Sequence, residues 1–212
     1  MVIIIGGMIG LGKTTTSKLL GERLSLPVYY ESVEGNEVLP LFYKASPEEK
    51  ESKRYPFLLQ LSFLTSRFKA IRSALSHDNA ILDRSIYEDR YFASRNHDLG
   101  NISDLEMALY DRLLKEVLAS LNSLPKKHPD VMVYLKGSFD TVLKRIKERG
   151  RSYELGEELV SYYHFLWEDY DRWVMESYKE SPLIVLDVDK VDILENKEDL
   201  DLLVEQVEHY SK

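Results

Sequence analysis

The most constraining feature of the sequence is a glycine-rich segment near its start. It reads Gly7-Met8-Ile9-Gly10-Leu11-Gly12-Lys13-Thr14, follows the apolar run Val2–Ile5 and precedes a helical pattern that begins at Thr15. Glycines let such a loop point its N–H groups inward as a nest for an anion, and the following helix adds its free N–H groups. In the Gly-x4-Gly-Lys-Thr pattern the lysine reaches the β- and γ-phosphates, and the threonine hydroxyl suits Mg²⁺. The alternative is a plain glycine turn with a solvated lysine, but strand, loop and helix in this order favour an ATP-type phosphate site.

Five short apolar runs predict the strands of a parallel sheet. They are almost continuously apolar rather than alternating, which is typical of strands that helices cover on both faces. Helical patterns separate them, so the sequence predicts a doubly wound α/β fold, with one domain over residues 1–212. The runs are Val2–Ile5, Val28–Tyr30, Ala80–Leu82, Val131–Leu135 and Leu183–Leu186.

Hydrophobic spacing and capping residues predict the helices that flank this five-stranded sheet. They are Thr15–Leu26, Val38–Tyr43, Pro56–Leu75, Ser103–Leu121, Ser138–Arg149, Glu157–Tyr178 and Leu200–Tyr210, with Ser46–Lys53 as an exposed loop. In the fourth of these helices, leucines at every fourth position (Leu105, Leu109 and Leu113) belong to a broad apolar stripe. Two roles stay open for this stripe, which are packing within the chain and the interface of a homodimer.

Composition restricts the classes of partner. The chain has 36 acidic and 28 basic residues, a formal net charge of −8, which argues against a nucleic-acid polymer as the main partner. It has no cysteine, so disulfides and cysteine metal sites are excluded. No apolar stretch reaches about 18 residues, and the first residues lack the pattern of a signal peptide. We therefore expect a cytoplasmic protein without a membrane partner.

Charged residues follow two further predicted strands. Glu31 follows the second strand, and Asp83 and Arg84 follow the third. Ligands of parallel sheets bind at the carboxyl ends of the strands, so these residues would converge on the glycine-rich loop if their strands are neighbours. Glu31 could then accept a proton from an acceptor hydroxyl, Asp83 could hold Mg²⁺ with Thr14, and Arg84 could contact phosphoryl oxygens. The alternatives are a solvated carboxylate at Glu31 and a surface ion pair at Asp83 and Arg84.

Three arginines lie at the end of the Ser138–Arg149 helix and just beyond it, at positions Arg145, Arg149 and Arg151. They could simply be favourable positive charge at a helix C-terminus. They could also form an arginine-rich lid that closes on the transferring phosphoryl group. The spacing alone leaves both interpretations open.

Four segments, taken in order, resemble the motifs of the deoxynucleoside kinases, and most closely those of the bacterial deoxyadenosine kinase group. They are Gly7–Thr15, Tyr30-Glu31-Ser32-Val33, Asp83-Arg84-Ser85-Ile86-Tyr87-Glu88-Asp89-Arg90 and Arg149-Gly150-Arg151. The resemblance covers nearly the whole chain. It implies a P-loop kinase fold with an arginine-rich lid, a homodimer, and Mg²⁺-dependent transfer of the ATP γ-phosphoryl to a deoxynucleoside 5′-hydroxyl in nucleotide salvage. The implied acceptor is deoxyadenosine first, then deoxyguanosine or deoxycytidine.

The resemblance also implies catalytic roles. Glu31 matches the general base that activates the sugar 5′-hydroxyl, and Arg84 matches the arginine that steadies the 5′-oxygen and the phosphate. Asp83 takes the place of the acidic residue that follows the third strand. The lid of the family is matched by Arg145, Arg149 and Arg151.

A third set of matches concerns the acceptor. Gln60 matches the glutamine that bonds to the nucleobase edge, and Arg67 and Asp89 match a pair that lines the base pocket. Tyr43 matches the tyrosine that holds the sugar 3′-hydroxyl, with Glu154 as the carboxylate beside it. A glutamine amide carries a donor and an acceptor, so it can pair with an adenine-type edge. The alternative for Gln60 is an ordinary amide on a helix surface.

Two other functions stay open. A nucleoside monophosphate kinase similar to thymidylate kinase would need further basic residues for the phosphate of its acceptor. A regulatory nucleotide-binding protein would not need Glu31. The segment Asn196-Lys197-Glu198-Asp199 fits the guanine motif of GTPases, but it does not directly follow a predicted strand, so it carries no functional prediction.

Overall fold

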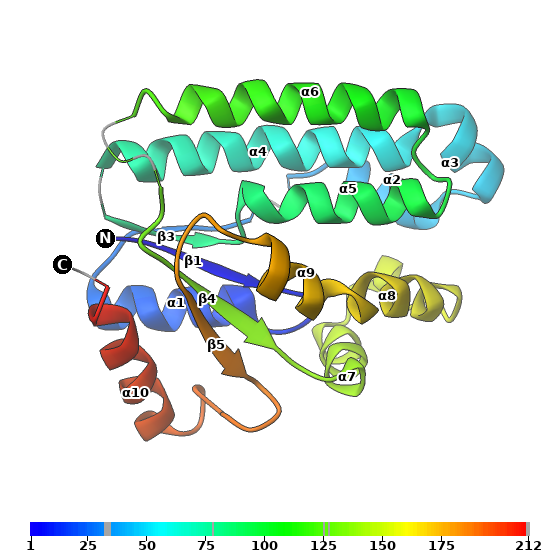
Figure 1. Cartoon of the computed structure of the whole chain (residues 1–212). Coiled ribbons are helices and arrows are strands. Elements are labelled where there is room, and N and C mark those ends of the chain that lie inside the picture. Colours follow the sequence, from blue (N-terminus) through cyan, green and yellow to red (C-terminus); the bar gives the residue numbers. More distant parts are fainter. Residues whose placement is uncertain (32–34, 78, 125, 127, 211–212) are drawn as a thin grey trace.

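The computed structural model describes residues 1–31, 35–77, 79–124, 126 and 128–210, so Ser32 and Val33 of the second motif lie outside the described residues. Its centre is a sheet of five strands in the order β2-β3-β1-β4-β5, and every neighbouring pair is parallel (Figure 1). The bounds are β1 Val2–Gly7, β2 Val28–Tyr29, β3 Ala80–Asp83, β4 Val131–Lys136 and β5 Leu183–Asp187. The five predicted strands are thus confirmed, each to within two residues at its ends.

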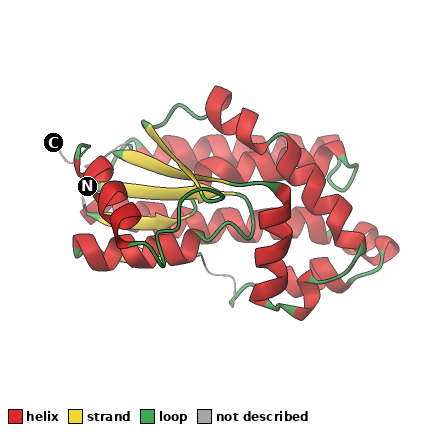
Figure 2. Ribbon diagram, turned by 90° about the horizontal axis from the view of Figure 1, so that it is seen from below, coloured by secondary structure: helices red, strands yellow, loops and turns green. Residues whose placement is uncertain are grey.

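Helices cover both faces of the sheet (Figures 1 and 2), which explains why Ile3, Ile4 and Ile5 of β1 are completely buried. On one side lie α4 (Tyr55–His77), α5 (Asp89–Asp98) and α6 (Asp104–Leu121), and on the other lie α1 (Lys13–Leu24) and α10 (Lys197–Glu208). The remaining helices gather near the carboxyl ends of the strands: α2 Val38–Lys44, α3 Pro47–Lys53, α7 Phe139–Arg149, α8 Glu158–Glu168 and α9 Tyr170–Ser177. No helix of the described residues is long and apolar enough to cross a membrane.

The helices of the structure differ from the prediction in three places. The segment Ser46–Lys53 is exposed as expected, but Pro47–Lys53 forms α3, whose start is fixed by a capping box between Ser46 and Glu49. The single helix predicted over Glu157–Tyr178 is two helices, α8 and α9, which are separated at Asp169 (φ −106°, ψ −3°). Helix α5 was not predicted at all, since most of its residues are polar or charged.

The apolar stripe of α6 is divided between the core and the surface. The core-facing residues are Met107, Tyr110, Leu114 and Leu121. Leu105, Leu109 and Leu113 are 69%, 42% and 45% exposed, so packing within the chain does not account for them.

The register of the sheet determines what meets at its carboxyl edge. Ile5 of β1 pairs with Asp83 of β3, and Leu82 of β3 pairs with Tyr29 of β2. The loop after β1 therefore lies beside Asp83 and Arg84, and Glu31 follows on the next strand. The neighbouring strands that the sequence analysis required are present.

Candidate active site

The glycine-rich loop connects β1 to α1 and wraps around the side chain of Lys13. Lys13 is buried, and its Nζ donates a hydrogen bond to the carbonyl of Met8 at 2.9 Å. At Gly10 the backbone has φ +86°, and an added Cβ would lie 2.9 Å from the carbonyl oxygen of Val142 in α7. Both the positive φ and the close approach of α7 require glycine there. The predicted strand–loop–helix arrangement over Gly7–Thr15 is confirmed.

The surroundings of Lys13 lower the pKa of its amino group. Burial lowers the pKa of Lys13, and the charge of Arg84 lowers it further, against the attraction of Glu31 and Asp83, so that the pKa falls to about 7. In the free protein Lys13 is therefore charged below about pH 7 and neutral above it. Phosphate groups placed against Nζ would favour the charged form.

Binding of ATP at pH 8 is therefore expected to take up close to one proton per site, and this uptake should disappear well below pH 7. Protons are taken up because Lys13 is neutral in the free protein above about pH 7 and becomes charged beside the phosphates. ATP affinity should therefore fall as the pH rises. Calorimetry in buffers of different ionisation enthalpy measures the uptake. Equal heats in all buffers at pH 8 would contradict this assignment.

Thr14 and Asp83 form a site that fits Mg²⁺. The Thr14 hydroxyl donates to Asp83 Oδ2 at 2.5 Å, while buried Oδ1 has no hydrogen-bond partner among the described residues. An orphaned carboxylate oxygen next to a phosphate loop suits a cation that prefers oxygen ligands. No group of three or more His, Cys, Asp or Glu in the described part of the chain could hold a metal.

Glu31 lies inside a buried charge network rather than in solvent. Its carboxylate accepts a hydrogen bond from Arg67 Nη2, and its Oε1 lies 3.5 Å from Arg84 Nε. Burial raises the pKa of Glu31, but the charges of Arg67 and Arg84 outweigh this effect and lower it to about 2. Glu31 is therefore ionised at neutral pH, and the alternative of a solvated loop carboxylate is wrong.

Arg84 is also buried, so the alternative of a surface ion pair at Asp83 and Arg84 is wrong as well. Its backbone has φ +70°, a left-handed conformation that is uncommon for a residue with a side chain. The guanidinium lies over the ring of Phe92, 4.7 Å from its centroid. Within the described residues, Nε and Nη1 of Arg84 make no hydrogen bond, and they face the carboxylates of Glu31 and Glu88 at 3.5 Å and 3.6 Å.

A partly open cavity lies beside Glu31. Four of the predicted acceptor residues line it, namely Tyr43, Gln60, Arg67 and Glu154. Gln60 is 4% exposed, so it is not an amide on the outer helix surface. The sequence analysis missed the apolar and aromatic wall: Leu39, Phe42, Leu59, Phe63, Phe92, Tyr162 and Leu166.

The position of Asp89 differs from the expectation. It is completely buried, and it is not among the described residues that line the cavity. Its Oδ1 accepts a hydrogen bond from Arg67 Nη1, on the guanidinium whose other nitrogen contacts Glu31. Asp89 therefore holds the Arg67 guanidinium in place and does not line the cavity.

A second cavity lies over the glycine-rich loop. It is lined by Gly10, Gly12, Thr14, Thr15 and Thr16 of the loop and α1, and by the segment Val188–Leu194 after β5, which no sequence signal indicated. The same four residues, Lys13, Glu31, Arg149 and Arg151, line both cavities. The two cavities therefore meet where charged groups are concentrated.

The three predicted lid arginines all face this region. Arg145 donates to the carbonyl of Leu11 in the loop at 2.8 Å. Arg149 and Arg151 both contact the buried carboxylate of Glu154, Arg149 through Nη2 and Arg151 through Nη1 at 3.4 Å. Favourable charge at the end of α7 alone does not explain these directed contacts.

The model of the family described as deoxynucleoside kinase matches residues 3–211. The chain belongs to the deoxynucleoside kinase family. The kinase is 43% identical over 209 residues to a deoxyguanosine kinase of Lactobacillus acidophilus, with 97% of this chain and 89% of that protein covered. It is 39% identical over 198 residues to a deoxyadenosine kinase of the same organism, with coverages of 92% and 89%.

A solved structure supports the same conclusion. The deoxyadenosine kinase of M. mycoides with bound dATP superposes on this kinase with a TM-score of 0.79 and 30% sequence identity. The match covers 98% of this chain and all of that one. The predicted P-loop kinase fold is thereby confirmed.

Proposed function

We propose that this kinase transfers the γ-phosphoryl of ATP to the 5′-hydroxyl of a deoxynucleoside and releases a deoxynucleoside monophosphate and ADP. The observation that carries the proposal is the set of residues that both cavities share. An acceptor in the cavity that Gln60 lines and a triphosphate on the glycine-rich loop would meet at Lys13 and Glu31. We further propose that residues 1–212 act as one kinase domain, and a cytoplasmic location stays a prediction.

Glu31 is the proton acceptor of this reaction. The 5′-oxygen attacks the γ-phosphorus, the bond to the β–γ bridging oxygen breaks, and the hydroxyl proton moves to the Glu31 carboxylate. With a pKa near 2, Glu31 is a weak base in the free protein, so its first role is to orient the hydroxyl. When phosphate oxygens engage Arg84, its attraction for Glu31 weakens, and the basicity of Glu31 rises.

The donor side is formed by the loop and its neighbours. Backbone N–H groups at the start of α1 and Lys13 hold the phosphates. Thr14 and Asp83 would hold Mg²⁺, which would neutralise negative charge on the phosphates. We assign Arg145, Arg149 and Arg151 to an arginine-rich lid, because they reach from α7 and its end to the loop and to Glu154.

Deoxyadenosine is the acceptor that we place first. The Gln60 amide offers the donor and acceptor that an adenine edge requires, and Phe63 and Phe92 offer aromatic faces for stacking. Tyr43 and Glu154 lie where they could hold the sugar 3′-hydroxyl. Deoxyguanosine is the second candidate, because Arg67 adds donors that suit the O6 and N7 acceptors of guanine, and because one relative is a deoxyguanosine kinase.

A competition assay separates these acceptors. The purified protein is supplied with ATP, Mg²⁺ and an equimolar mixture of the four deoxynucleosides, and the monophosphate products are resolved by chromatography. We expect deoxyadenosine monophosphate first, followed by the deoxyguanosine and deoxycytidine products. A parallel reaction with thymidine monophosphate tests the rival kinase class, and transfer to that acceptor alone would overturn the proposal.

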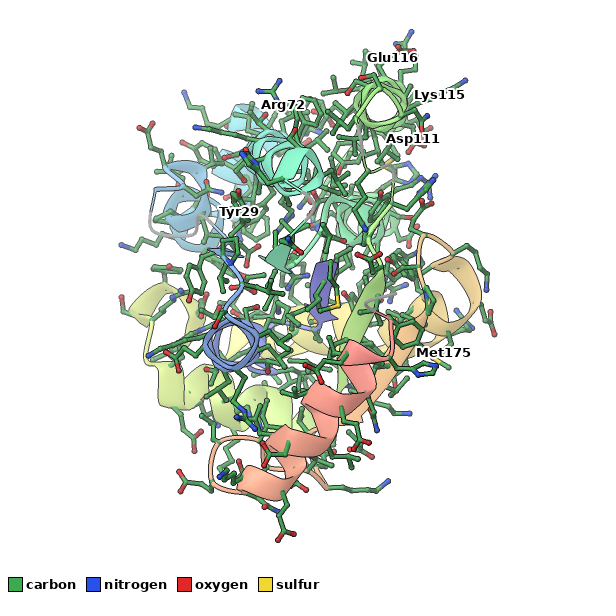
Figure 3. The ribbon with its side chains drawn as sticks, turned by 90° about the vertical axis from the view of Figure 1, so that its left-hand side faces the viewer. Tyr29, Arg72, Asp111, Lys115, Glu116 and Met175 are labelled. Carbon is green, nitrogen blue, oxygen red and sulfur yellow. The ribbon has the colours of Figure 1, made fainter. Side chains whose placement is uncertain are left out.

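The exposed face of α6 supports a homodimer. Leu105, Leu109 and Leu113 lie four residues apart on one side of the helix, where water covers them in an isolated chain. Charged side chains, including those of Asp111 and Lys115, project from the same helix (Figure 3). A second copy of this chain is the partner we propose, because two identical stripes can bury each other about a two-fold axis.

Leu109→Glu is therefore expected to convert the dimer to a monomer, because it places a charge in the centre of the buried stripe. Sedimentation velocity measures the change in mass. Leu202→Glu in α10 is the matched control, since Leu202 is 55% exposed and α10 lies across the sheet from α6. An unmodified chain that sediments as a monomer, or equal masses for both variants, would refute this interface.

A further inference from the structure

One buried carboxylate near the site is not used by the reaction described above. Glu88 has no exposed surface, and it forms a capping box with Ser85. In most capping boxes the glutamate bonds only to the N–H of the capping residue at its own helix start. Here the same carboxylate also contacts two other parts of the chain.

The contacts of Glu88 join the two sides of the site. Its Oε2 accepts the N–H of Ser85 at 3.1 Å, which is the peptide group directly after Arg84. Its Oε1 accepts the N–H of Gly7 at 3.1 Å, which is the first residue of the glycine-rich loop. The Arg84 guanidinium lies 3.6 Å from the same oxygen. One rigid group therefore fixes the distance between the loop and Arg84.

A third element reaches the same oxygen. The hydroxyl of Tyr170, at the start of α9, donates to Glu88 Oε1. Tyr170 is buried in an aromatic cluster in which its ring lies 4.9 Å from the Tyr91 ring, centroid to centroid. Tyr170 thus keeps the carboxylate in the position where it can serve both peptide groups.

A buried carboxylate is costly unless charge and hydrogen bonds compensate it, and this one is compensated by groups that belong to the phosphate site. A structural role alone would be met by the capping contact with Ser85. The additional contacts go to Gly7 and Arg84, which the reaction needs at a fixed separation.

We propose that Glu88, held by Tyr170, is a positioning residue that sets the start of the phosphate loop against Arg84. The inference rests on the proposed function for its catalytic consequence. Its structural consequence, a correctly placed phosphate loop, can be measured through ATP binding alone.

Two variants test the proposal. Glu88→Gln keeps the shape but leaves one acceptor oxygen, so that an amide N–H would face the N–H of Gly7 or Ser85. Tyr170→Phe removes only the hydroxyl that holds the carboxylate. We expect kcat to fall about 10²-fold in Glu88→Gln, because small displacements of reacting groups cost about that much, while the deoxynucleoside KM stays unchanged. For Tyr170→Phe we expect about a tenfold loss, as for one hydrogen bond.

Tyr91→Phe is the matched control. It removes a buried tyrosine hydroxyl from the same aromatic cluster, one that donates to the carbonyl of Leu166 at 2.7 Å and does not touch Glu88. Thermal unfolding of all three variants separates stability from catalysis. We expect Tyr91→Phe and Tyr170→Phe to lose similar stability and only Tyr170→Phe to lose kcat. If Glu88→Gln does not fold, Tyr170→Phe decides the question.

Equal kcat in Tyr170→Phe and Tyr91→Phe would overturn the inference. A second readout is the ATP dissociation constant, which we expect to rise about tenfold in Glu88→Gln, or about 1.4 kcal/mol, and to stay unchanged in Tyr91→Phe. If the unmodified protein transfers no phosphoryl group, the proposed function fails. The ATP affinities then still decide whether Glu88 positions the loop.

Discussion

Glu31→Gln is expected to lower kcat by about 10²- to 10⁴-fold, the range for the loss of a positioned general base. The amide has nearly the shape of the carboxylate, but it cannot accept the proton of the 5′-hydroxyl. It also removes the negative charge that Arg67 and Arg84 surround. Affinity for ATP should survive, because the phosphate loop itself is unchanged. Steady-state kinetics with saturating acceptor and calorimetric ATP binding measure the two effects.

Glu22→Gln is the control for this substitution. Glu22 lies on α1 with a side chain that is 64% exposed, so the same chemical change there should leave kcat unaltered. A Glu31→Gln protein with full kcat would exclude Glu31 as the base.

Lys13→Met is expected to reduce kcat by about 10²- to 10³-fold, the usual cost of removing one group that stabilises charge in the transition state. Lys13 is the buried lysine of the loop and lines both cavities. Methionine keeps much of the side-chain volume but contributes no charge to the phosphates. ATP affinity should fall with kcat, whereas binding of the deoxynucleoside alone should persist.

The matched control is Lys18→Met. Lys18 is on the same helix, but its side chain is 66% exposed and pairs with Glu22. Its loss should change neither kcat nor ATP affinity. If Lys13→Met and Lys18→Met behaved alike, the loop would not hold the transferring phosphate.

Much of the fold was predictable because its signals are local. The strands are continuous apolar runs, and the loop from Gly7 to Thr14 combines strand, glycines and helix start. Helix α5 escaped prediction because its partners are distant: Arg95 contacts the carbonyl of Phe165 and the carboxylate of Glu168. The break at Asp169 was not predicted because the helical spacing of apolar residues continues through it.

The charged part of the site was predictable because it stands at strand ends, as Glu31, Asp83 and Arg84 do. The apolar wall of the acceptor cavity was not, because residues such as Phe63 and Leu166 have the same helical spacing as core residues. The role of Glu88 was not predictable either, for a different reason. The sequence assigns Glu88 no role of its own, and only the folded chain shows that its carboxylate caps Ser85 and reaches Gly7.

The most direct test of the central claim is the fate of a labelled γ-phosphoryl group. The protein is given ATP labelled at the γ-phosphate, Mg²⁺ and deoxyadenosine, with 2′,5′-dideoxyadenosine in a parallel reaction. We expect label in deoxyadenosine 5′-monophosphate, and no label in the analogue that lacks the 5′-hydroxyl, although it should compete with deoxyadenosine for the cavity. Label in the analogue, or no transfer to any of the four deoxynucleosides, would contradict the account.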